Sequence, residues 1–184
     1  FVTIFIGILC ILANLEKDFK LNLRQTFLFS TLAWVTVAAF GSLPFLLSNQ
    51  TFSFSDAFFE SMSGITTTGA TIISDLDNSP KSILLWRAIM QWLGGIGIVV
   101  MAITILPLLK VGGMQLFKME GPDSTEKILP RTIEVAAIII STYVILTLFC
   151  GLFYWIFGMT VFDSICHSMT TIATGGFSTH NDSI

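Results

Sequence analysis

The sequence predicts an all-α membrane protein in which long spanning helices alternate with short helices that enter the bilayer and turn back. Three observations lead to this fold class. Hydrophobic residues make up 53% of the 184 positions, charged residues make up only 11%, and the mean hydropathy is +0.82. Apolar runs of spanning length recur along the chain. A short Thr- and Gly-rich segment also occurs twice at one fixed spacing.

The composition excludes several classes of protein. A soluble domain normally carries about 25% charged residues, so this chain has too little polar surface to cover a water-facing globule. A soluble enzyme and a disordered segment are therefore excluded, and the net charge of −3 argues against a nucleic-acid binder. We interpret the cysteines, which have neither metal-binding nor disulfide spacing, as small buried hydrophobic residues: Cys10, Cys150 and Cys166.

The apolar runs divide the chain into two predicted repeats. A span needs about 20 apolar residues to cross the hydrocarbon core. We expect a piece of a longer protein, because the chain opens inside an apolar run and closes just after a Gly-rich turn. The predicted elements are the end of a preceding transmembrane helix (1–15), a first pore repeat (26–109) with helices at 26–47 and 83–109, a cytoplasmic loop (110–131), and a second pore repeat (132–184) truncated after its turn.

The short segment 54–65 differs from the spans. As a helix it would reach only about 18 Å, at about 1.5 Å per residue, whereas the hydrocarbon core is about 30 Å thick. It also carries Asp56 and Glu60, so it is not a lipid-facing span. The sequence therefore predicts a re-entrant pore helix, whose non-helical exit at 66–70 must be buried in protein or line a watery cavity.

The basic residues predict the orientation in the membrane. Seven of the nine Lys and Arg residues fall in the loops on either side of the first repeat, which the positive-inside rule places in the cytoplasm. The opposite face is acidic, and an acidic mouth raises the local concentration of cations. We assign the following acids to that external face: Asp56, Glu60, Asp75, Asp77, Asp163 and Asp182.

The repeat itself is the strongest signal. A constant offset of 107 positions places six identical residues on one another: Asp56 on Asp163, Ser61 on Ser168, Met62 on Met169, Ile65 on Ile172, Thr67 on Thr174, and Gly69 on Gly176. Each copy follows an apolar span and ends in a Thr/Gly-rich turn, so the repeating unit fixes the architecture as channel-like helix, pore loop and helix.

The chemistry of such a turn suits a cation. Glycine permits backbone conformations in which successive carbonyls point to one side, and a cage of carbonyl oxygens can replace the water shell of a hard cation. The short helix also points its negative C-terminal end toward the same place. About four such turns are needed to close a ring, so further units must come from associated chains or from missing sequence, and we favour the missing sequence.

Three motifs in this order resemble the TrkH/KtrB (Trk/Ktr/HKT) potassium-uptake superfamily: SMSGITTTGAT at 61–71, WRAIMQWLGGIG at 86–97 and ATGGFSTH at 173–180. The resemblance implies a fold of four repeats, potassium uptake through a pore, and a selectivity filter of backbone carbonyls. By the same resemblance, the filter positions are Thr67, Thr68, Gly69, Thr174, Gly175 and Gly176, with Thr66 and Ala173 one layer deeper.

The resemblance also implies surroundings that these residues do not show. K⁺ would be the transported ion, with no cofactor, in a multi-pass protein of the bacterial cytoplasmic membrane. The full-length protein would form a homodimer and bind a cytoplasmic nucleotide-binding regulatory subunit of TrkA type. The superfamily's gating loop would lie in a third repeat, outside this sequence.

Several alternatives stay open. A secondary transporter with broken helices is the main rival, and it would need inverted repeats. An intramembrane enzyme is the second rival, but the sequence has no catalytic nucleophile. The cluster Gly94-Gly95-x-Gly97 is interpreted as helix packing rather than as a nucleotide loop.

Individual polar residues each have two interpretations. Arg87 either lies near the permeation path, paired with an acid, or snorkels to the headgroups, which is favoured. His167 and His180 either titrate at the mouth or are satisfied polar residues there, which is favoured. Asp56 and Asp163 either cap the short helices, which is favoured, or attract cations directly.

Overall fold

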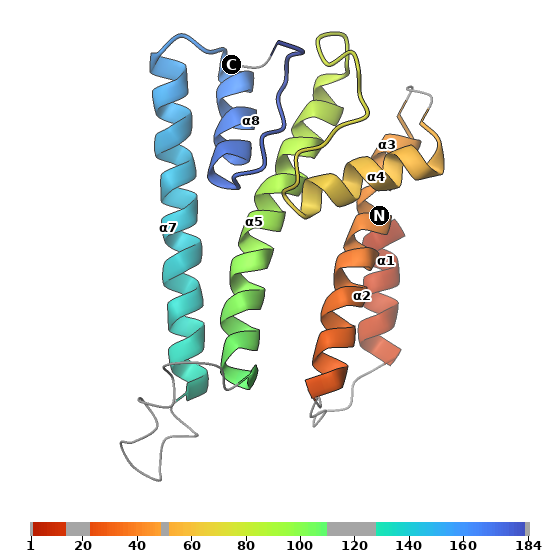
Figure 1. Ribbon diagram of the computed structural model, residues 1–184, viewed down its shortest axis with the longest axis vertical. Coiled ribbons are helices and arrows are strands. Elements are labelled where there is room, and N and C mark those ends of the chain that lie inside the picture. The colour runs from red at the N-terminus through yellow and green to blue at the C-terminus, as the bar shows by residue number, and fades with distance from the viewer. Residues whose placement is uncertain (1, 14–22, 49–51, 110–127, 183–184) are drawn as a thin grey trace.

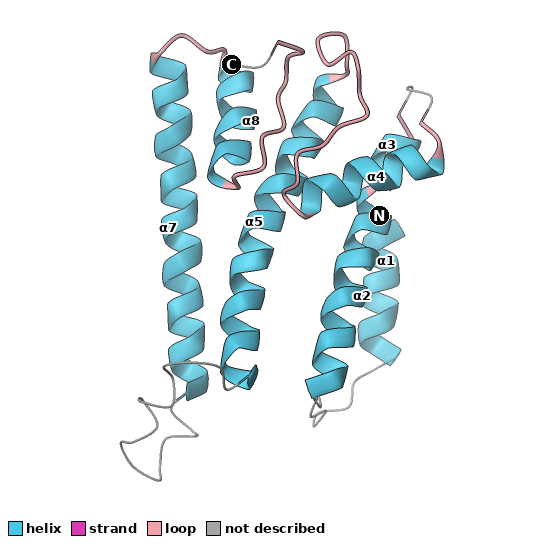
Figure 2. Ribbon diagram, viewed as in Figure 1, coloured by secondary structure: helices cyan, strands magenta, loops and turns pink. Residues whose placement is uncertain are grey.

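The computed structural model describes residues 2–13, 23–48, 52–109 and 128–182, and these parts contain helices and loops without strands (Figures 1 and 2). The elements in chain order are α1 (Val2–Ala13), α2 (Leu23–Gly41), α3 (Leu43–Leu46), α4 (Phe54–Ile65), α5 (Lys81–Leu109), α7 (Ile128–Ile156) and α8 (Val161–Ile172).

Three segments of the described chain are long and apolar enough to cross a membrane: Arg24–Leu46, Lys81–Met101 and Glu134–Ile156. The short helices α4 and α8 lie near one end of the long ones (Figure 1). After each short helix the chain turns and runs back to the end from which that helix was entered (Figure 2). The predicted fold class, an all-α membrane protein with re-entrant half-helices between spans, is confirmed.

Some element boundaries differ from the expected ones. The first span, expected as one helix over 26–47, is interrupted after Gly41, and α3 resumes with Pro44 in its first turn. Proline fixes φ and lacks an N–H, so it is tolerated at the start of a helix and not inside one. The helix α7 begins at Ile128, which takes Arg131 out of the expected loop. The remainder of that loop, 110–127, lies outside the described residues.

The central element is α5, which packs against α4, α7 and α8. Its three glycines face three different neighbours: a side chain at Gly94 would collide with the backbone of Ile65, one at Gly95 would meet Tyr143 and Ala173, and one at Gly97 would touch Trp34. The interpretation of this cluster as close helix packing is confirmed.

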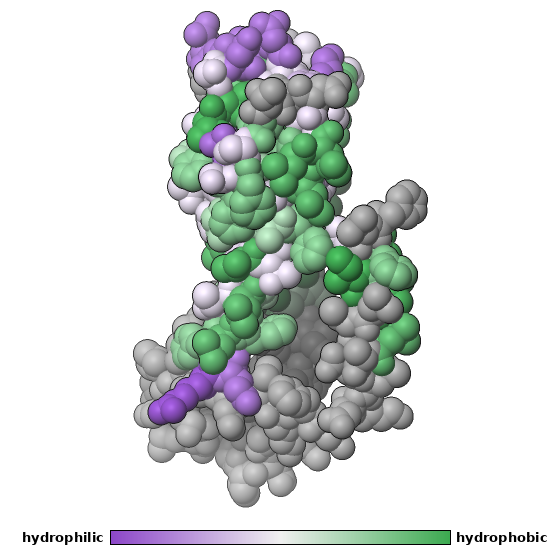
Figure 3. All heavy atoms as spheres, turned by 90° about the vertical axis from the view of Figure 1, so that its right-hand side faces the viewer, coloured by the Kyte–Doolittle hydropathy of each residue, from purple (hydrophilic) through white to green (hydrophobic). Residues whose placement is uncertain are grey.

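The outer surface suits a bilayer. Large apolar side chains are exposed along α2 and α7, for example Phe29, Ile138 and Phe153 at 55% or more. On the face drawn in Figure 3, apolar side chains cover the middle of the flank, and hydrophilic ones gather at the top and in a smaller patch lower down. Contiguous exposed apolar surface of this extent is a liability in water and is expected where lipid tails cover the protein.

Candidate functional site

Both short helices begin with a hydroxyl residue as N-cap and an aspartate three positions later. Ser53 accepts a hydrogen bond from the backbone N–H of Asp56 at 3.2 Å, and Asp56 accepts one from the N–H of Ser53 at 3.2 Å, which makes a complete capping box. Thr160 accepts from the N–H of Asp163 at 3.2 Å in the same way. The capping role expected for Asp56 is confirmed, whereas the carboxylate of Asp163 instead accepts from the hydroxyl of Thr160 at 2.5 Å.

The two helices also end alike. The N–H of Thr67 bonds the carbonyl of Gly64 at 3.0 Å, and the N–H of Thr68 bonds that of Ser63 at 2.9 Å. The corresponding bonds recur 107 positions later, where Thr174 and Gly175 donate to Thr171 and Thr170 at 2.9 Å each. This is the Schellman pattern, which places one residue in the left-handed region just after the helix.

Threonine occupies that left-handed position in both turns. The φ angles are +57° at Thr67 and +56° at Thr174, and both following glycines, Gly69 and Gly176, have a φ of +79°. A β-branched residue at positive φ is a genuine outlier, and strain of this kind clusters at functional sites. Because Thr68 and Gly175 have no positive φ, the sign alternates along each turn, which allows successive carbonyls to face one side.

The two turns meet although they are far apart in sequence. A side chain built at Gly69 would collide with the carbonyl oxygen of Gly175, so the backbones are in direct contact there. Gly69 therefore has two reasons to be glycine, a left-handed φ and this close approach. The structure brings the six predicted filter residues into one region at the inner ends of α4 and α8.

A buried ion pair lies behind the first turn. Arg87 Nε donates to Glu60 Oε1 at 2.7 Å, and the two side chains are 1% and 0% exposed. The favoured expectation that Arg87 snorkels is wrong, because an acid on the facing helix α4 neutralises it in the interior. Glu60 is accordingly not part of an exposed acidic mouth, to which it was assigned.

The Arg87–Glu60 pair also forms hydrogen bonds to residues that lie just after both turns. Glu60 accepts from the hydroxyl of Thr71 at 2.9 Å and from the N–H of Ile72 at 3.0 Å, both just after the first turn. Arg87 Nη1 donates to the carbonyl of Ser178 at 3.1 Å, after the second turn, and its guanidinium lies 4.1 Å from the centre of the Phe177 ring.

Among the described residues the second turn has no counterpart of this ion pair, and it is also held through Thr179. Thr179 donates its hydroxyl to Asp163 Oδ1 at 2.7 Å and lies 3.2 Å from Nε2 of His167. Since the one hydroxyl hydrogen of Thr179 goes to Asp163, His167 Nε2 is the donor to Thr179. The preferred interpretation of His167, a satisfied polar residue, agrees with this buried position.

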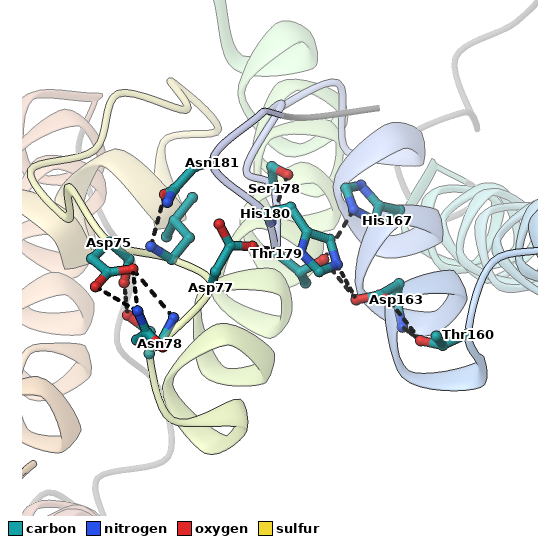
Figure 4. Close-up of polar contacts among 12 residues, drawn as sticks. Asp75, Asp77, Asn78, Thr160, Asp163, His167, Ser178, Thr179, His180 and Asn181 are labelled. Atoms are coloured by element: carbon teal, nitrogen blue, oxygen red, sulfur yellow. Dashed lines mark hydrogen bonds and ion pairs between the residues drawn. The ribbon is translucent and has the colours of Figure 1, made fainter.

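The outer loops of the two repeats are joined at His180 (Figure 4). Its Nδ1 lies 2.7 Å from Asp77 Oδ1, its Nε2 lies 3.4 Å from Asp163 Oδ1, and its side chain is 54% exposed. The hydrogen bond to Asp77 raises the pKa of His180 above its ordinary value, and Asp163 adds to the effect. Beside it, the N–H of Leu76 donates to Asn181 at 2.8 Å.

Sequence reasoning missed Gln91, Ser178 and Thr179 as parts of this site. Gln91 accepts a hydrogen bond from the N–H of Phe177 at 3.2 Å and is fully buried. A polar residue one turn after Arg87 in an apolar span was the available signal. In the described part of the chain no group of three or more His, Cys, Asp or Glu side chains is arranged to hold a metal ion.

Comparisons with known proteins agree with this geometry. The family model described as "Cation transport protein" (TrkH) matches residues 1–184. The chain is 48% identical to the Trk system potassium uptake protein TrkH of Vibrio parahaemolyticus and 46% identical to that of Escherichia coli K12, in each case over the whole chain and 39% of the relative. The chain thus spans about two fifths of the length of these relatives.

A solved structure is similar as well. The crystal structure of the potassium transporter TrkH from Vibrio parahaemolyticus superposes with a TM-score of 0.84 at 44% identity, covering 98% of this chain and 36% of that one. Family model, relatives and fold agree, and the chain belongs to the TrkH family of cation transport proteins.

Proposed function

We propose that this chain is part of a protein that takes up potassium ions across the bacterial cytoplasmic (inner) membrane through a channel-like pore. The selectivity filter would include the backbone carbonyls of Thr67, Thr68, Gly69, Thr174, Gly175 and Gly176. The observation that carries the proposal is the pair of turns with matching left-handed positions, held in contact at the ends of two re-entrant helices.

The proposed mechanism is dehydration against fixed dipoles. Carbonyl oxygens on one side of each turn replace the water shell of the ion, and the C-terminal ends of α4 and α8 add partial negative charge. Exposed acids on the outer loops, such as Asp75 and Asp77, concentrate cations at the mouth. The membrane potential drives entry with about 2.3 kcal/mol per 100 mV for each charge.

Two turns do not close a ring, so the proposal assigns the remaining turns to the rest of the longer protein. The relatives are named Trk system potassium uptake proteins. We therefore propose that the full-length protein works as a homodimer with a nucleotide-binding regulatory subunit of TrkA type, and that it transports ions rather than catalysing a reaction. The rival, a secondary transporter built on inverted repeats, is not favoured, because both short helices enter from the same end (Figure 1).

Substitution of the filter glycines in the complete protein tests the proposal. Gly69→Ser and Gly176→Ser should each lower uptake of Rb⁺, used as a K⁺ tracer, and reduce its preference over Na⁺ in cells that lack other potassium uptake systems. Gly158→Ser is a matched control for Gly176→Ser. Both glycines have positive φ and no atom within 4 Å of an added Cβ, but Gly158 lies outside the turns. Unchanged selectivity in both filter variants, or an equal loss in Gly158→Ser, would reject the assigned filter.

A further inference from the structure

Gln91 reaches from the middle of α5 to the place where the two turns meet. Its side chain is fully buried, and Oε1 accepts the hydrogen bond from Phe177 N–H. Without this acceptor the N–H, which follows directly on the second turn, would be left buried and unsatisfied. Gln91 Nε2 has no hydrogen-bond partner among the described residues.

The carboxamide of Gln91 occupies the space that a side chain at Gly175 would need. A Cβ added at Gly175 would overlap the carbon, the oxygen and the nitrogen of that group. Gly175 has no positive φ, so its backbone alone does not require glycine. The requirement is steric, and it comes from Gln91.

This contact explains the one difference among the three filter positions of each turn. Position 175 corresponds to Thr68, so the sequences are Thr-Thr-Gly in the first turn and Thr-Gly-Gly in the second. Thr68 is exposed and its hydroxyl lies 2.8 Å from that of Thr66, whereas Gly175 is buried beneath Gln91. The missing side chain in the second turn makes room for a side chain that belongs to the first repeat.

Gln91 also lies beside the first turn. Its Nε2 is 3.6 Å from the position of a Cβ added at Gly69, at the point where Gly69 contacts the carbonyl of Gly175. One carboxamide is therefore packed against the backbone of both turns, behind their line of contact.

We propose that Gln91 is a positioning residue that sets the spacing between the two turns, and through it the discrimination among alkali cations. The inference rests on the proposed filter. Whether selectivity depends on the size of the carbonyl cage or on the number and field of its oxygens, both change when the turns move relative to one another.

A size-swap experiment in the complete transporter tests the inference. Gly175→Ala should lower K⁺ uptake about tenfold or more, because the added methyl group overpacks the space that Gln91 fills. Gln91→Ala, which empties the space, should keep transport but reduce the ratio of Rb⁺ to Na⁺ uptake about fivefold. The double variant should take up K⁺ clearly faster than Gly175→Ala alone, because the added methyl group then occupies space that Gln91 has vacated.

The readouts are the KM for K⁺, the maximal rate per molecule of folded protein, and the ratio of Rb⁺ to Na⁺ uptake. Gly97→Ala on the same helix, where a Cβ meets only Trp34 at ordinary contact distance, should change none of them. If Gly175→Ala does not yield folded protein, Gln91→Ala and the shorter amide of Gln91→Asn still carry the test, with selectivity lost in the first and partly kept in the second.

Wild-type selectivity in Gln91→Ala, or a double variant no better than Gly175→Ala, would overturn the inference. These outcomes differ from a failure of the proposed filter. If Gly69→Ser and Gly176→Ser alter selectivity while the Gln91 series does not, only the role of Gln91 is wrong.

Discussion

The two repeats share their turns and differ in what holds the turns in place. Cap position, final hydrogen bonds and the φ angles of the turns correspond one to one, at an offset of 107 residues. Behind them, position 60 is a carboxylate paired with Arg87, whereas the corresponding position 167 is a histidine bonded to Thr179. The repeats share the turn geometry that a carbonyl filter would require. They differ in the side-chain contacts that hold each turn in place, which we call its anchorage.

The anchorage crosses from one repeat to the other. Arg87 and Gln91, one turn apart on α5 of the first repeat, both bond the backbone after the second turn, at Ser178 and Phe177. In the outer loops, His180 of the second repeat reaches Asp77 of the first. The second turn is thus held partly by the first repeat, and the outer loop of the first repeat is joined to the second, so neither repeat is an independent unit of stability.

The largest expected effect breaks the buried ion pair. Arg87→Met or Glu60→Gln leaves one buried group without its partner, which costs about 3–5 kcal/mol when the remaining group is charged. The yield and melting temperature of the full-length protein in detergent should fall sharply for Arg87→Met, whereas the combination Arg87→Met/Glu60→Gln should recover part of the loss.

His167→Gln is the matched change in the second repeat. It disturbs one hydrogen bond between neutral groups, worth about 1 kcal/mol. A melting temperature lowered as much by His167→Gln as by Arg87→Met would contradict the difference in anchorage drawn between the two repeats.

A second, smaller effect separates the two glycines that share a φ of +79°. Alanine at either one meets the cost of the left-handed region, about 1–2 kcal/mol. Only at Gly69 would the added methyl group also collide with a backbone carbonyl, that of Gly175, while the space at Gly176 is open. Gly69→Ala should therefore destabilise the protein and impair K⁺ uptake more than Gly176→Ala, and equal losses would show that φ alone sets the requirement.

The local features of these repeats could be predicted from the sequence. The range of α4, the offset of 107 and the role of Asp56 follow from helix length, residue identity and cap chemistry, which act over a few positions. The assignment of filter residues stays a prediction, although the structure places all six together. The resemblance, not the spacing, supplied their individual identities.

The anchorage could not be predicted from the sequence, because it depends on which side chains meet after the chain folds back. Arg87 in an apolar span allowed two interpretations, and the favoured one was wrong since the acid that pairs with it lies 27 positions earlier on another helix. Gln91 and Gly175 are 84 positions apart, and neither is unusual in its own surroundings. Their contact exists only because the turn of the second repeat docks against α5.

The smallest expected effect concerns pH and belongs to the second repeat alone, since the position that corresponds to His180 is Ile73. The raised pKa of His180 means that its protonated form is favoured in the folded protein by Asp77 and Asp163, against a smaller opposing effect of desolvation. The contribution of this contact to stability is therefore fully present below the ordinary pKa of about 6.5 and is lost as the pH rises through the raised pKa of the folded state.

Hydrogen exchange at Leu76 N–H, corrected for its intrinsic pH dependence, should show protection that weakens over this interval. Because His180 is half exposed and solvent screens the contact, the change should stay within the outer loops and leave exchange in α4 unaltered. A His180→Asn variant should lose the pH dependence, and persistence of that dependence in the variant would assign it to another group.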